Sequence, residues 1–296
     1  METNSKNIRE SRAIEEILPA DVAYYQKPIE LGTKETMETL RDLETTWDSD
    51  ISAFMWDMVG VTDAHFLDRH LHHLWQIVIK LAKNTHFDDS KQDSLVRWIL
   101  SIREMGVLTD PKNTSVVAKA SNGQRLWVDL PYLADEVRKC WIIHLSMTVE
   151  QRANFASFIA RLVSVGVCSN ALAVCGLLLF RDTFEIPRQL KKTDSGLLES
   201  KDISVEELLP AVRSWTDYAS FKLVSLTLKS FNEYSAEDSD LGQLIEDRSI
   251  THGFSSYRWD FWKKRLVQFI EGGYEPVASE AAEIIRQMAV EGYSPL

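Results

Sequence analysis

The sequence predicts an all-α protein, and three observations support this fold class. Apolar residues recur at helical spacing over long stretches, most clearly between residues 63 and 83. Sustained alternation of apolar and polar residues, the pattern of a half-buried strand, is almost absent. No repeat of fixed length is visible, which argues against a solenoid. We therefore expect a single domain that forms an irregular bundle of about ten helices.

The domain boundary is placed at residue 32. Residues 1–32 are predicted to hold a short amphipathic helix over 8–18 and an extended segment, and residues 33–296 the all-α domain. The chain is 45% hydrophobic and 26% charged, which is ordinary for a globular protein with a core. Its polar N-terminus has no apolar stretch behind it, so we expect no secretory signal and a cytoplasmic location.

Helical patterns follow one another through the predicted domain. They cover residues 33–46, 50–59, 63–83, 89–105, 131–141, 148–165, 169–185, 203–230, 255–269 and 277–290. Thr148 and Gln151 resemble a capping box at one helix start. Pro131 fits the first turn of another helix, where its missing N–H donor is not needed. Residues 106–125, with Gly, Pro, Asn and Ser, predict a surface loop with room for a brief strand.

The helix over 255–269 carries the strongest apolar stripe. Trp259, Trp262, Leu266 and Phe269 stand at i, i+3, i+7 and i+10 and share one face. Ser255 or Ser256 can cap its first turn. One interpretation is that the core closes on this helix. The other is that a tryptophan and Arg258 wall a ligand pocket, and both stay open.

An uncharged run from Leu162 to Phe180 is long enough to span a bilayer. Ser164, Gly166 and Asn170 interrupt it, in a pattern typical of one helix ending and another beginning. We therefore interpret the run as two buried helices that meet at a short turn, and we expect no membrane span.

Composition and motifs exclude several function classes. The net charge of −11, with no basic block longer than Lys263–Arg265, argues against nucleic acid as a partner. Three cysteines at irregular spacing predict neither a disulfide framework nor a zinc site. The 12 glycines form no Gly-x-Gly-x-x-Gly and no phosphate loop, so we expect no nucleotide and no other cofactor.

Two patterns suggest metal binding, and neither leads us to predict a metal. His65, Asp68 and His72 could share one helical face, but their spacing is not that of the His-Glu-x-x-His metalloproteases. The acids of 88–93 resemble the magnesium motif of class I terpene cyclases. They also open a helix, where negative charge stabilises the dipole, and the second cyclase motif is absent.

Aromatic residues are the remaining candidates for a binding site. Nine tryptophans are present, and core packing explains any one of them taken singly. A pocket for a flat apolar molecule would be built from the same rings and a few polar groups, among them His144. The candidate substrate-binding residues are His72, Trp75, Trp127, Tyr132, Trp141, Trp215, Tyr218, Arg258 and Trp259.

Three stretches resemble a fungal family of unknown function that takes its name from a protein of an oxopyrrolidine biosynthesis cluster. They are the segment from Leu74-Trp75 to Val96, the Trp-x-Asp-Leu-Pro element at 127–131, and the Phe-Ser-x-x-Arg-Trp-x-Phe-Trp-Lys element at 254–263. The resemblance covers roughly residues 60–290. It implies a helical, cytosolic fungal protein, with some members encoded in secondary-metabolite clusters, and it supplies no catalytic motif.

The resemblance and the aromatic residues together lead to a functional hypothesis. We expect a cofactor-independent cyclase, a pericyclase of the Diels–Alder type, or an isomerase that acts on an apolar intermediate of fungal secondary metabolism. Such catalysis needs a shaped pocket and one or two hydrogen-bond donors. A non-catalytic helical scaffold protein is the alternative, and a magnesium-dependent terpene cyclase the third reading. The expected partner is an apolar small molecule, and a homodimer is left open.

Overall fold

The computed structural model describes residues 64–110, 113–191, 203–247 and 252–290. All of them lie in one of the two compact units of the chain, residues 50–296. The predicted boundary at residue 32 and the helices predicted over 8–18, 33–46 and 50–59 lie outside the described residues.

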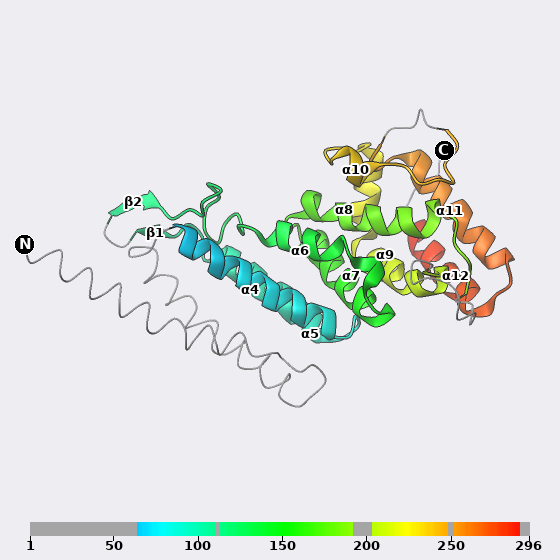
Figure 1. The fold of residues 1–296 in the computed structure, drawn as a ribbon, viewed down its shortest axis with the longest axis horizontal. Helices are drawn as coiled ribbons and strands as arrows, with labels where there is room; N and C mark the ends of the chain where they lie inside the picture. The colour runs from blue at the N-terminus through cyan, green and yellow to red at the C-terminus, as the bar shows by residue number, and fades with distance from the viewer. Residues whose placement is uncertain (1–63, 111–112, 192–202, 248–251, 291–296) are drawn as a thin grey trace, which may run out of the picture. The chain divides into compact units, whose positions relative to one another are not determined.

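Helices dominate the described ranges, which confirms the predicted all-α class (Figure 1). The nine α-helices in these ranges are α4 (Ala64–Asn84), α5 (Ser90–Glu104), α6 (Leu133–Trp141), α7 (Val149–Ser164), α8 (Ser169–Phe180), α9 (Val205–Leu228), α10 (Ala236–Ser239), α11 (Ser256–Glu271) and α12 (Glu275–Val290). A short antiparallel hairpin, β1 (Thr109–Asp110) with β2 (Asn113–Val117), lies within the loop predicted over 106–125.

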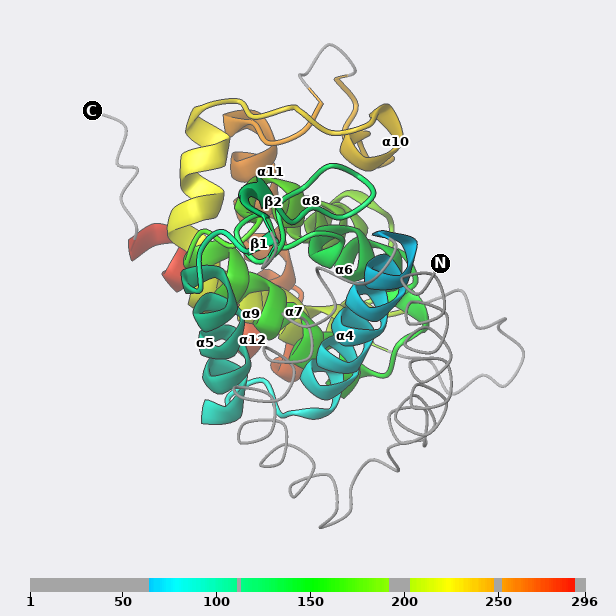
Figure 2. The ribbon, with the colours of Figure 1, turned by 90° about the vertical axis from the view of Figure 1, so that its left-hand side faces the viewer.

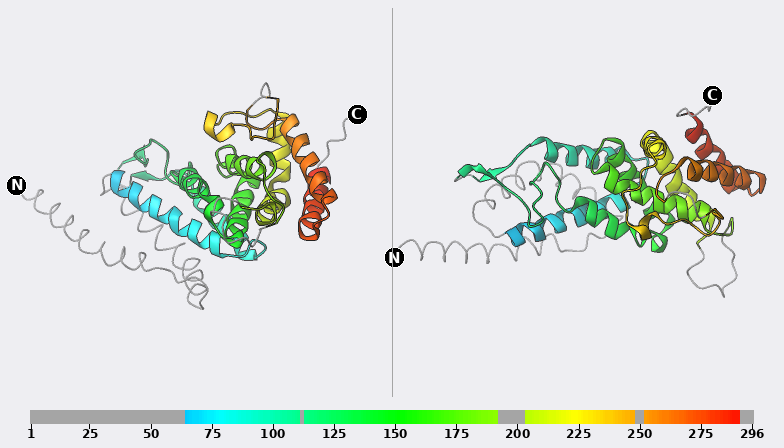
Figure 3. Two further views of the ribbon diagram at one scale, coloured as in Figure 1. Left: turned by 45° about the vertical axis from the view of Figure 1, so that its right-hand side comes forward. Right: turned by 90° about the horizontal axis from the view of Figure 1, so that it is seen from above.

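Helix α7 is at the centre of the bundle. It packs against α4, α5, α8 and α9, and every residue from Arg152 to Val163 is buried. Helices α7 and α9 lie side by side (Figure 2). Helix α12 covers α9 and packs against α11, and this pair lies at the end of the bundle away from the hairpin (Figure 3).

The uncharged run from Leu162 to Phe180 forms two helices, as predicted. Helix α7 ends at Ser164 and α8 begins at Ser169. Between them, Gly166 and Cys168 have φ of 79° and 47°, which breaks the helical path. Within the described ranges, no helix has both the length and the apolar character needed to cross a membrane.

Side-chain caps fix several helix starts where the sequence predicts them. Thr148 Oγ1 accepts a hydrogen bond from Gln151 N at 3.1 Å, and Ser255 Oγ accepts one from Arg258 N at 3.3 Å. The start of α6 differs from the prediction. Pro131 is not in its first turn, because Tyr132 adopts a left-handed conformation and delays the helix to Leu133.

The predicted helix over 169–185 also ends differently. It is α-helical to Phe180 and then forms a π-helical turn, Arg181–Glu185. Asp182 and Glu185 in this turn are buried. Since π-helical turns are rare and often lie at functional sites, these two carboxylates are candidates for a functional role.

Candidate functional site

A half-exposed polar cluster joins α4 to α6. His72 Nδ1 lies 2.9 Å from Glu136 Oε1, and the side chains are 32% and 8% exposed. Glu136 also accepts hydrogen bonds from Lys139 Nζ at 2.8 Å and from Gln76 Nε2 at 3.2 Å. We call His72, Gln76, Tyr132, Glu136 and Lys139 the His72 cluster.

The contacts of Glu136 fix the chemistry of His72. Burial raises the pKa of the Glu136 carboxyl, but the hydrogen bonds from Lys139, Gln76 and His72 outweigh it and leave the pKa below its ordinary value. The ionised carboxylate therefore accepts the Nδ1–H of His72. In the neutral imidazole Nε2 then carries the lone pair, and it has no protein partner among the described residues. A carboxylate-held imidazole with one exposed nitrogen is typical of a general base.

Tyr132 covers the ring of His72. The two ring centroids are 4.2 Å apart and the planes are inclined by 29°. Partial burial, and then a hydrogen bond to Asp68, raises the pKa of the Tyr132 hydroxyl. Asp68 Oδ1 also accepts from the backbone N of Ser121 at 3.1 Å, so the tyrosine is held at its hydroxyl end as well as at its ring.

The loop that delivers Tyr132 has an unfavourable backbone. Trp127, Leu130 and Tyr132 have φ of 66°, 48° and 66°, and they are three of the five non-glycine residues with positive φ in the described ranges. Each such residue costs about 1–3 kcal/mol, and such costs concentrate at functional sites. Trp75 Nε1 donates to the carbonyl of Pro131 at 2.7 Å and helps to hold the loop, which we call the 126–132 loop.

A second pair, Glu185 with Arg258, is entirely buried, with both side chains 0% exposed. Arg258 Nε and Nη2 donate to the two carboxylate oxygens of Glu185 at 2.8 and 3.0 Å. The indole N–H of Trp262 donates to Oε1 at 2.7 Å, and the backbone N of Gly242 donates to Oε2 at 2.8 Å. The carboxylate is thus fully engaged within the protein.

The guanidinium of Arg258 is engaged as completely as its partner. Nη1 donates to the carbonyls of Ser239 and Gly253 at 3.0 and 2.9 Å. A side chain on Gly242 could not fit, since an added Cβ would lie 2.3 Å from the Cβ of Glu185. Arg258 therefore offers no donor to a ligand, and the pair holds α11 to the π-helical turn.

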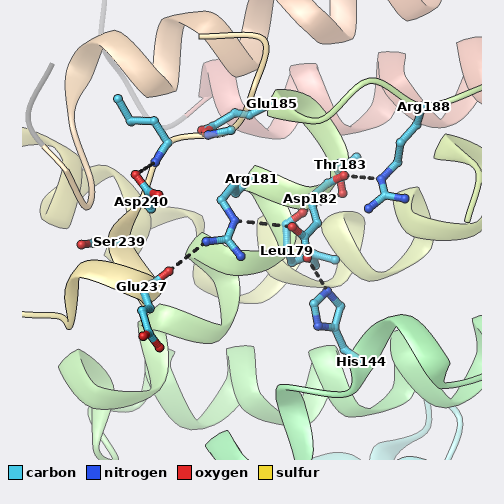
Figure 4. Close-up of polar contacts among 12 residues, drawn as sticks. His144, Leu179, Arg181, Asp182, Thr183, Glu185, Arg188, Glu237, Ser239 and Asp240 are labelled. Carbon is cyan, nitrogen blue, oxygen red and sulfur yellow. Dashed lines mark hydrogen bonds and ion pairs between the residues drawn. The ribbon is translucent and has the colours of Figure 1, made fainter. Parts of the chain in front are cut away.

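A third pair joins His144, which lies between α6 and α7, to Asp182 near the start of the π-helical turn (Figure 4). His144 Nε2 lies 3.2 Å from Asp182 Oδ2, and Nδ1 lies 2.9 Å from the carbonyl of Trp141. Burial raises the pKa of Asp182, but His144, Arg181 and Arg188 outweigh it and lower the pKa below its ordinary value. The pair is nearly inaccessible, with side chains 4% and 7% exposed.

The nine candidate residues do not form one site. His72, Trp75 and Tyr132 come together, and Trp127 is in the loop that contacts them. Trp141 and Trp215 are buried in the core, as are Arg258 and Trp259 near the Glu185 pair. Tyr218 lies elsewhere, with the guanidinium of Arg161 3.7 Å above its ring.

Glu136, Asp182 and Glu185 are the residues that the sequence analysis missed. A signal existed for Glu136, because it follows the buried Leu133 by three residues and therefore shares the inward face of α6. No local pattern marks the two carboxylates of the π-helical turn.

The acidic residues near α5 have separate partners. Asp89 caps α5 through Lys91 N at 2.9 Å, Asp93 pairs with Arg161, and Asp88 accepts from Tyr218 at 3.4 Å. Among the residues that the structure describes, no group of three or more His, Cys, Asp or Glu is placed to hold a metal ion.

The part of the chain that is similar to known proteins includes most of the described residues. The family model described as "Protein of unknown function (DUF3632)" matches residues 75–266. "Oxopyrrolidines biosynthesis cluster protein G" of Penicillium oxalicum is 32% identical over 237 residues, which cover 75% of this chain and 64% of that protein. The chain thus spans a little under two thirds of the length of this curated relative. No solved structure gives a significant match.

Proposed function

This chain belongs to the family of proteins of unknown function DUF3632, and from that premise we propose that it acts in fungal secondary metabolism. The activity we propose is a cofactor-independent isomerase or cyclase for an apolar intermediate, with His72 as the general base. The name of its Penicillium relative, a protein of an oxopyrrolidines cluster, supports the metabolic setting.

The single observation that carries this proposal is the His72–Glu136 contact at 2.9 Å. Glu136 holds Nδ1–H, so the exposed Nε2 can take a proton from a carbon next to a substrate carbonyl. The carboxylate then stabilises the imidazolium that forms. Tyr132 shields one face of the ring. Such a positioned base contributes about 10²–10⁴ to the rate.

The reaction class follows from what happens to the proton. If His72 returns it to another carbon of the same molecule, a double bond moves and the product is an isomer. If the enolate carbon instead attacks a second electrophilic carbon, a ring closes, and the proton goes to the atom that receives the electron pair. Neither course requires a redox partner. A purely pericyclic closure would need only the shape of the site and would not use Nε2.

The test is turnover of oxopyrrolidines that carry unsaturated side chains, run in D₂O and followed by NMR and mass spectrometry. We expect an isomer that has gained deuterium, and a loss of about a hundredfold or more in His72→Gln. His252→Gln, which changes an exposed histidine, is the control. Wild-type turnover by His72→Gln would refute the assignment of the base.

A second candidate function is non-catalytic protein binding, and one feature favours it. Ile142, Ile143 and Leu145, between α6 and α7, are 68%, 57% and 38% exposed. Neighbouring exposed apolar residues of this kind mark interaction surfaces. Ile143→Ser with Ile142→Ser should leave turnover intact if the protein is an enzyme. The magnesium-dependent cyclase is not proposed, because Asp88, Asp89 and Asp93 are engaged separately.

A further inference from the structure

The indole of Trp127 is buried without a hydrogen-bond acceptor. The residue is 3% exposed, and no described residue accepts from its Nε1–H. Two other buried indoles do have acceptors: Trp75 donates to the carbonyl of Pro131 and Trp262 to Glu185, both at 2.7 Å. A buried unpaired donor is unfavourable and requires an explanation, such as a water or a ligand.

Two other indoles share this property, and their surroundings separate them from Trp127. Trp141 and Trp215 lie in regular helical turns of α6 and α9 and are 0% exposed. The ring of Trp141 stacks on His144 at 4.9 Å, and that of Trp215 packs against Gly176. These contacts place both rings in the packed core between helices. Trp127 instead lies in the 126–132 loop with a left-handed backbone, so strain and an unpaired donor coincide at one residue.

We propose that the Nε1–H of Trp127 binds a carbonyl oxygen of a small-molecule ligand at the 126–132 loop. The same loop delivers Tyr132 to His72, so the donor and the proposed base belong to one structural unit. The inference deepens the proposed function and rests on it for the use of the carbonyl, but binding can be measured without turnover.

The charges of the loop favour a neutral carbonyl over a carboxylate. Arg125 is the cation nearest in sequence to Trp127, and Asp129 engages two of its three donor nitrogens, with Nη2 to Oδ1 at 2.7 Å and Nε to Oδ2 at 3.0 Å. An anionic ligand would find the charge of Arg125 already paired with Asp129 and would be repelled by that carboxylate. The expected ligand class is a ketone or cyclic amide that also has an acidic C–H for His72.

The experiment is a titration of ¹⁵N-tryptophan-labelled protein, observed through the indole N–H resonances. Pyrrolidin-2-one is the probe, and cyclopentane is the analogue of equal ring size without a carbonyl. Trp127→Phe assigns the resonance, and if that variant does not fold, nuclear Overhauser contacts in the wild type assign it.

We expect a saturable downfield shift of the Trp127 N–H proton with pyrrolidin-2-one, and no comparable shift of the Trp141 and Trp215 resonances. Trp127→Phe should bind the probe about three- to tenfold more weakly, the effect of one neutral hydrogen bond. An unmoved Trp127 resonance, an equal shift with cyclopentane, or rapid solvent exchange that shows a water already on Nε1–H would overturn the proposal.

The same titration on His72→Gln separates this inference from the proposed function. If the Trp127 shift persists while turnover is lost, both stand. If wild-type protein shows the shift and His72→Gln retains full turnover, the binding site stands and the role of His72 falls.

Discussion

The His72 cluster and the Glu185–Arg258 pair contain the same kinds of side chain, but they differ in how fully the protein satisfies their hydrogen-bonding groups. Each joins a carboxylate to a basic side chain far along the chain, over 64 and 73 residues. The Glu185 pair is fully buried and its donors and acceptors are satisfied by the protein. The His72 cluster leaves an imidazole nitrogen exposed beside a strained loop. Only the incomplete cluster has chemistry to offer a ligand.

The comparison also separates two of the three sequence elements that resemble the family. Arg258, Trp259 and Trp262, from the element at 254–263, hold α11 to the core. The shorter Trp-x-Asp-Leu-Pro element forms the strained loop beside His72. A motif can therefore be distinctive because it is needed for folding, and four predictions test this division.

The largest expected effect comes from removing one partner of the buried pair. Glu185→Leu leaves the charge of Arg258 buried and uncompensated, which should lower the free energy of unfolding by about 3–5 kcal/mol. Urea denaturation measures this loss. The double variant Glu185→Leu with Arg258→Met should recover much of it, since apolar replacement of a buried pair is well tolerated. A loss below about 1 kcal/mol in the single variant would contradict the structural role.

Gly242→Ala should have the second-largest effect. It should lower the free energy of unfolding by about 3 kcal/mol, because the new Cβ overlaps Glu185. Its distance to the Glu185 Cβ would be 2.3 Å, and to the Glu185 carbonyl oxygen 2.6 Å. Gly272→Ala is the matched control, as its Cβ would approach the flexible end of Leu190 at 3.2 Å and would meet the carbonyl oxygens of Gln268 and Phe269 at an ordinary contact distance of 3.4 Å. Equal urea midpoints for the two variants would show that Gly242 is not required by close approach.

Asp182→Asn should destabilise the protein by about 2 kcal/mol at neutral pH, the value of a hydrogen bond to a charged group. Because the folded-state pKa of Asp182 lies below its ordinary value of 3.8, the ionised carboxyl stabilises the fold above that value and loses this effect as pH falls through the folded pKa. The difference in stability between the wild type and Asp182→Asn should therefore become smaller as the pH falls. Thermal unfolding from about pH 5 to pH 2 measures it. Asp260→Asn, at an exposed position, should show no such convergence.

The smallest expected effect on stability is that of Glu136→Gln, below about 1 kcal/mol, because its partner His72 is one-third exposed. Its effect on turnover should be large, about a hundredfold, since an amide no longer stabilises the imidazolium. Stability and turnover measured on one preparation test this. A large stability loss with unchanged turnover would place the His72 cluster with the structural pairs.

The helices were predictable from the sequence because apolar periodicity is a local property. The pattern over 63–83 corresponds to Ala64–Asn84, and the pattern over 203–230 to Val205–Leu228. Ser255 and Thr148 were identifiable as caps because their partners lie three residues away. The turn between α7 and α8 was also predictable, because the residues that interrupt the uncharged run are a local signal.

The pairing of side chains was not predictable, because it depends on which helices pack together. His72 meets Glu136 only because α4 lies against α6, and Glu185 meets Arg258 only because a π-helical turn faces α11. Trp127, Leu130 and Tyr132 give no local signal of a left-handed backbone, since tertiary contacts impose it on residues that disfavour it. Several residues of the candidate site were thus predictable from the sequence, but which of them lie together was not.

The 73-residue separation of Glu185 and Arg258 bears on the order in which the protein can be made. A ribosome delivers Glu185 well before Arg258, so in the growing chain the π-helical turn after α8 carries a carboxylate whose burial has no compensation. We expect the bundle to close around it only after α11 has emerged. A chain released before residue 258 would then remain open around α8, with its apolar surface available to chaperones or aggregation.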